Sequence, residues 1–176
     1  MPSTRRATRV LSHAERGNRP VVDTVILDYV QRSAQKITAT GVKGGQFEID
    51  LAAPVRLRTD DALLLDDGGL IEVVAAPEPL IEARAPDLAQ LARLAWHLGD
   101  RHVPAQLFAN RIRVRREPAI EALLKALGVK TTAIEAPFEP EGGAYESSHG
   151  HAHAHGHDHA HDHHHDHAHG DHHHDY

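Results

Sequence analysis

The sequence predicts an α+β protein in three parts, and three observations lead to this prediction. The first half carries short runs in which apolar and polar residues alternate between glycine- and aspartate-rich turns, a pattern typical of β-strands. After Pro77-Glu78-Pro79, stretches of helical period lie between the strands. The end of the chain has too little apolar surface to build a core. The predicted parts are residues 1–76, 77–146 and 147–176.

Composition limits the class of protein. The chain of 176 residues has no cysteine, so any metal must be held by nitrogen and oxygen ligands. Its formal net charge is −6, most of it from aspartates near the end, so the remainder is close to neutral. No apolar run is long enough to cross a membrane, and the N-terminal arginines precede no apolar segment. These features predict a cytoplasmic protein with no nucleic-acid or membrane partner.

The first part is predicted to be a small all-β domain of short antiparallel strands. Its first twenty residues are rich in arginine and are expected to form a frayed end before the first strand. No stretch of helical period is found in this part. The expected strands are 25–30, 47–51, 55–58, 63–65 and 70–74. The glycine-rich turn 66–69 is expected to join the last two.

The second part alternates strands with two amphipathic helices. Asp87 is expected to cap a helix that ends at Gly99, and Pro118 to begin a second helix that ends before Gly128. The apolar stripe of the first helix is predicted to contain Leu88, Leu91, Leu94, Ala95 and Leu98. A strand at 80–83, a hairpin of 105–108 with 111–114 and a strand at 130–134 complete the order β-α-β-β-α-β. This order is that of the ferredoxin-like split fold.

Two histidines of the second part are candidate ligands. His97 lies off the centre of its helix's apolar stripe, so it is not expected in the domain core. Two copies of it, brought together by a two-fold axis, could share an ion that one surface histidine binds weakly. On pattern alone, a surface histidine is favoured over this role. His102 is either a second ligand or a partner of turn backbone, and the latter is favoured.

The basic strand 111–116 raises the question of nucleic-acid binding. Its alternation favours a half-solvated strand face, because no aromatic residues interleave with the arginines. The chain also has no glycine-rich phosphate loop and no hydrolase or metalloprotease motif, so we do not expect an enzyme.

The end of the chain holds 15 of its 18 histidines together with five aspartates. Imidazole nitrogen suits zinc, copper and nickel, so residues 147–176 are predicted to be a disordered metal-binding tail. A purification tag, a pH-responsive tail and a repetitive tract without a role are the other interpretations. The candidate ligands of the tail are His149, His151, His153, His155, His157, His159, His161, His163, His164, His165, His167, His169, His172, His173 and His174.

Three segments resemble the urease accessory protein UreE family. They are residues 96–104 (WHLGDRHVP), the helix at 120–124 and residues 137–145 (PFEPEGGAY) ahead of a histidine-rich end. The resemblance implies a homodimeric cytoplasmic nickel metallochaperone that delivers Ni(II) to urease with the other urease accessory proteins and the urease apoprotein. It implies an N-terminal domain similar to the peptide-binding domain of DnaJ-type co-chaperones. It places the interfacial nickel ligand on His97, with further ligands from the tail.

Two alternatives to a delivery role stay open. One is a histidine-rich store for divalent metals, and the other is a protein-assembly module whose tail is incidental. Zn(II) or Cu(II) is expected to compete for the same nitrogen ligands. The accessory histidines that some members of the family carry before the second helix are absent from residues 114–118 here.

Overall fold

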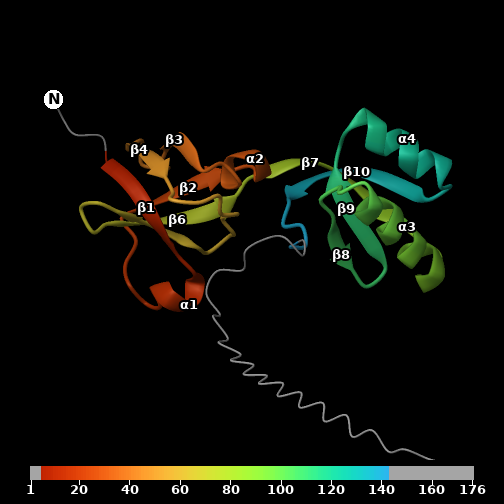
Figure 1. The fold of residues 1–176 in the computed structure, drawn as a ribbon, viewed down its shortest axis with the longest axis horizontal. Coiled ribbons are helices and arrows are strands. Elements are labelled where there is room, and N and C mark those ends of the chain that lie inside the picture. Colours follow the sequence, from red (N-terminus) through yellow and green to blue (C-terminus); the bar gives the residue numbers. More distant parts are fainter. Residues whose placement is uncertain (1–4, 143–176) are drawn as a thin grey trace, which may run out of the picture. The chain divides into compact units, whose positions relative to one another are not determined.

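The computed structural model describes residues 5–142, which belong to one compact unit and contain an N-terminal sheet-rich domain and a C-terminal α/β domain (Figure 1). The predicted metal-binding tail lies outside the described residues. The sheets change between β6 and β7, where we predicted a domain boundary, and that boundary stays a prediction. Among residues 5–142, no helix has both the length and the apolar content that a membrane crossing requires.

The N-terminal sheet has six strands in the order β2-β6-β5-β1-β4-β3. Their bounds are β1 Arg5–Leu11, β2 Asp23–Leu27, β3 Lys36–Thr40, β4 Gln46–Asp50, β5 Ala62–Leu65 and β6 Leu70–Ala75. The alternation that predicted β4 is confirmed, because Phe47 and Ile49 are fully buried in the core. The glycine-rich turn between β5 and β6 is also confirmed, and Gly68 adopts a positive φ of 85° there.

Several expectations for this domain are wrong. The sheet is mixed rather than antiparallel, since β1 pairs with β4 and β2 with β6 in parallel. Residues 5–11 are not a frayed end but an interior strand, because β4 and β5 pair on either side of them and Ala7 and Leu11 are buried. The segment 55–58 is not a strand. Its Leu57 is buried, and the Leu57 backbone nitrogen donates to the Arg32 carbonyl instead of to a neighbouring strand.

Two short helices also interrupt a domain that we predicted to lack them. They are α1, His13–Arg16, and α2, Tyr29–Arg32. Asp28 caps α2, accepting from the Gln31 nitrogen, while the Gln31 side chain accepts from the Asp28 nitrogen. This reciprocal cap ends the strand at Leu27, so the apolar run 25–30 divides between a strand and a helix.

The C-terminal domain has the predicted element order. Its antiparallel strands β7 Pro77–Arg84, β8 Gln106–Phe108, β9 Arg111–Arg115 and β10 Lys130–Pro137 form a sheet of order β10-β7-β9-β8. The helices α3, Leu88–Asp100, and α4, Pro118–Ala126, cover one face of this sheet (Figure 1). The core between them contains Ile81, Ala83, Leu91, Leu94, Leu98, Ile112, Val114, Ile120 and Leu124.

The helix ends agree in part with expectation. The Asp87 side chain accepts from the Gln90 nitrogen and so caps α3, and Pro118 occupies the first turn of α4. Gly99 does not stop α3, which continues to Asp100. The left-handed residue after the helix is His102, with a φ of 53°, and its nitrogen donates to the Gly99 carbonyl at 3.0 Å.

Candidate metal centre

His97 lies in the last turn of α3 and is half-buried, outside the domain core as predicted. Its ring packs edge-on against the neighbouring Trp96 ring, with 5.0 Å between the centroids. The Nδ1 atom of His97 is shielded from solvent and has no hydrogen-bond partner among the described residues. Other side-chain atoms, such as Gln90 Oε1 and Gln106 Oε1, are in the same state, so this feature does not by itself mark a ligand site.

The described residues do not complete a metal site around His97. Residues 5–142 contain no cluster of three or more histidine, aspartate or glutamate side chains placed to hold an ion. His97 is therefore not part of such a cluster within the described range. The tail histidines, which are the other predicted ligands, lie outside that range.

The surface beside His97 is apolar and exposed. Leu88 is 75% exposed and Trp96 is 65% exposed, and Ala92 lies between them at the i+4 spacing of one helix face. The prediction that Leu88 belongs to the core is wrong, because the stripe that faces the sheet consists of Leu91, Leu94 and Leu98. We call Leu88, Ala92 and Trp96 the α3 stripe.

His102 is exposed. The hydrogen bond to turn backbone that we favoured for it is instead made by its backbone nitrogen. His102 lines a hollow of about 360 Å³, together with Gly99 of α3 and Gly142 near the end of the described chain. His97 does not line this hollow.

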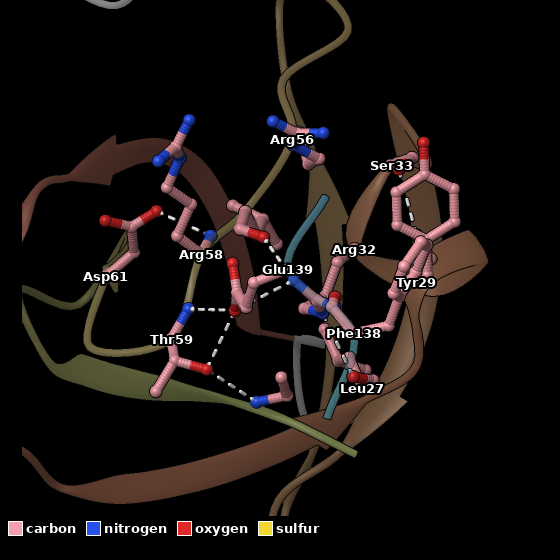
Figure 2. Close-up of polar contacts among 12 residues, drawn as sticks. Leu27, Tyr29, Arg32, Ser33, Arg56, Arg58, Thr59, Asp61, Phe138 and Glu139 are labelled. Atoms are coloured by element: carbon pink, nitrogen blue, oxygen red, sulfur yellow. Dashed lines mark hydrogen bonds and ion pairs between the residues drawn. The ribbon is translucent and has the colours of Figure 1, made fainter. Parts of the chain in front are cut away.

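The segment after β10 is clasped by a buried arginine of the N-terminal domain (Figure 2). The Arg32 side chain has no exposed surface and donates to the carbonyls of Leu27, Leu57 and Phe138. It also pairs with the Glu139 carboxylate at 3.2 Å. Sequence reasoning missed this clasp, since nothing in the pattern around residue 32 distinguishes a buried arginine from a solvated one.

Further contacts extend the clasp on both sides. Glu139 also accepts from the backbone nitrogen and hydroxyl of Thr59, at 3.1 and 3.0 Å (Figure 2). Phe138 is buried, with its ring edge-on to Tyr29. The Glu141 nitrogen then donates to the Ala105 carbonyl, just before β8. The chain thus crosses from β10, at one edge of the C-terminal sheet, to β8 at the other edge.

Comparison with known proteins agrees with this two-domain arrangement. The family model "UreE urease accessory protein, N-terminal domain" matches residues 7–76, and the model "UreE urease accessory protein, C-terminal domain" matches residues 78–175. These matches place the chain among the accessory proteins of urease assembly rather than among catalytic enzymes.

Curated relatives lead to the same family. The urease accessory protein UreE of Bradyrhizobium sp. (strain ORS 278) is 52% identical over 147 residues, which cover 83% of this chain and 70% of the relative. UreE of Beijerinckia indica is 48% identical over 143 residues, which cover 81% of this chain and 82% of the relative. The chain belongs to the UreE urease accessory protein family.

Proposed function

We propose that this protein binds nickel(II) and delivers it in the cytoplasm during assembly of the urease active site. Membership of a urease accessory family supports this role, and the site observation that supports it is the position of His97, which is half-buried on a packed helix beside the exposed α3 stripe. Nickel(II) accepts imidazole nitrogen readily, so the chemistry of the residue fits the cargo.

We further propose that the protein is a homodimer formed through the α3 stripe. An exposed leucine and tryptophan on one helix face are the kind of surface that a partner covers. A two-fold axis through such a face repeats it on both protomers and brings the two copies of His97 toward each other. One ion could then be shared between subunits, which explains why one set of described residues contains no complete site.

The fifteen tail histidines are proposed as further nickel ligands. Many imidazoles along one segment give interchangeable chelates, and ligand exchange is what delivery to another protein requires. The nitrogen ligands alone do not select nickel, because copper(II) binds them more tightly and zinc(II) competes. Selection therefore belongs to the metal supply and to docking with the other accessory proteins and the urease apoprotein.

The C-terminal domain is proposed to be ferredoxin-like. The order β10-β7-β9-β8, with α3 and α4 on one face, supports this assignment. In such an arrangement, the helix that carries His97 follows directly from the strand β7. The proposed metal ligand is therefore held by a packed element rather than by a loop.

Trp96 provides the experiment. It is the only tryptophan of the chain, and its ring contacts the His97 ring, so an open-shell ion bound at His97 should quench its fluorescence. We expect a saturable quenching step on nickel titration that His97→Ala removes and His102→Ala retains. Equal quenching of all three proteins would show that nickel does not bind at His97.

A further inference from the structure

The face of the C-terminal sheet opposite α3 and α4 carries two rows of side chains across its four strands. Directly paired residues of antiparallel strands share a face, so the register defines each row. One row, which contains three cations side by side, is Lys130, Arg84, Arg111 and Phe108. The next row is Thr132, Glu82, Arg113 and Gln106. We call these eight residues the basic face.

A single carboxylate holds the arginines of the basic face. The Glu82 carboxylate contacts Arg84 at 2.6 Å, Arg113 at 3.0 Å and Arg111 at 3.1 Å. Arg111 and Arg113 also lie over the Phe108 ring, 4.4 and 4.8 Å from its centroid. These contacts fix the guanidinium groups before any partner arrives, which lowers the entropy lost on binding.

The charge of this face is not what stability alone would favour. Like charges on directly paired residues are destabilising, yet Lys130, Arg84 and Arg111 are neighbours in one row. Glu82 is one negative charge among four positive ones in the two rows. The surplus positive charge is accessible, since the Arg84 side chain is 48% exposed and Lys130 is exposed.

We propose that the basic face is a docking surface for a carboxylate-rich protein partner in urease assembly. The arginines already bind one carboxylate, Glu82, so their geometry suits others. Nucleic acid is the less suitable ligand. Phe108 is the only aromatic residue of the two rows, and two guanidinium groups already pack on its ring, whereas single strands need free aromatic rings for stacking. This proposal adds a partner surface to nickel delivery and does not depend on His97.

The test is an NMR titration that follows the backbone amide signals of the full ¹⁵N-labelled chain. The probe is a peptide of about twelve residues in which glutamate and serine alternate, added at about 150 mM salt. We expect amide shifts concentrated on β7, β9 and β10. Arg84→Gln/Lys130→Gln should weaken binding about tenfold, because it removes two of the cations that attract the peptide. The matched control is Lys125→Gln/Arg58→Gln, which changes the net charge equally at two exposed positions elsewhere and should bind as the wild type does.

The remaining outcomes decide against the proposal. Equal weakening by both double variants, or no shifts at this salt, would show that the face has no docking role of its own. Stronger amide shifts with oligouridylate of equal length would assign the basic face to nucleic acid. Peptide binding that is seen only after deletion of residues 147–176 would show that the face instead binds the aspartate-containing end of the same chain. Nickel quenching of Trp96 in the same variants tells the two proposals apart. This quenching should be unchanged in variants that have lost docking, whereas a wild type that shows no quenching step would contradict nickel binding at His97 and leave the docking proposal untouched.

Discussion

At the scale of single residues, Arg32 shows how a charge can be buried without being isolated. It satisfies three carbonyls and one carboxylate, which offsets the cost of removing its guanidinium from water. These acceptors come from the end of β2, from the loop before β5 and from the segment after β10. One side chain therefore joins parts of the chain that are more than a hundred positions apart.

Replacement of Arg32 by methionine should lower the free energy of unfolding by about 3 kcal/mol, because the carbonyls of Leu57 and Phe138 would stay buried without a donor. Chemical denaturation measures the change. Arg58→Met is the control, since Arg58 is an exposed arginine of the same domain. An equal, small loss in both variants would contradict the role assigned to the clasp.

Glu82 gives a prediction about pH. Burial acts to raise its pKa, but hydrogen bonds from Arg113 and Arg84 and the charges of Arg84 and Arg111 outweigh burial, so its pKa is lowered from the ordinary value of 4.5. The unfolded chain therefore takes up this proton first as the pH falls. The stabilisation from Glu82 is complete above about 4.5 and is lost as the pH falls through the lower folded-state pKa.

Denaturation curves between neutral pH and pH ~3 should show this loss in the wild type. Glu82→Gln should be less stable near neutrality and should lack this part of the pH dependence. Glu135→Gln, which alters an exposed carboxylate on β10, should keep it. An unchanged pH profile in Glu82→Gln would mean that the three arginines do not stabilise the ionised form.

At the scale of elements, α3 presents two different faces. Leu91, Leu94 and Leu98 pack on the sheet, whereas Leu88 and Trp96 face away from it. His97 lies beside the second face. The helix is therefore suited to hold the domain together and to meet a partner at the same time.

If the α3 stripe forms the dimer interface, Leu88→Glu/Trp96→Glu should convert the dimer to a monomer, because carboxylates would be buried without partners. Light scattering over a range of concentrations measures the mass. Val42→Glu, at an exposed apolar residue of the N-terminal domain, is the matched control and should remain dimeric. A dimer that survives the double change would place the interface elsewhere.

At the scale of the whole molecule, a nickel store would depend on the tail histidines alone, whereas a delivery protein would also use the proposed site at His97. Replacing all fifteen tail histidines by asparagine keeps the length and the aspartates but removes the imidazoles. We expect most of the nickel capacity to be lost in equilibrium dialysis, while the Trp96 quenching step and part of the urease activation in cells persist. Complete loss of activation would favour a store over a delivery protein.

The parts of the fold that the sequence predicted well are those governed by local rules. Alternation identified β4, the glycine turn identified the β5–β6 hairpin, and Asp87 and Pro118 identified both helix starts. The errors arose where distant partners decide the outcome. Residues 5–11 look like a charged terminus until β4 and β5 pair on either side of them. His97 was singled out from pattern and family resemblance, but its position beside exposed apolar residues of α3 is visible only in three dimensions.

The sequence by itself determined the local elements of the C-terminal domain, the absence of thiolate chemistry and the abundance of imidazole, because capping, periodicity and composition act over a few neighbouring residues. The tertiary structure alone decided which charges are buried, which apolar residues are exposed and which cations become neighbours. Arg32 and the arginines around Glu82 read alike as basic residues of a soluble protein. They differ because the tertiary fold places backbone carbonyls around Arg32, whereas strand pairing places the arginines around Glu82 beside one another. Both sets of contacts join residues that are far apart in the chain.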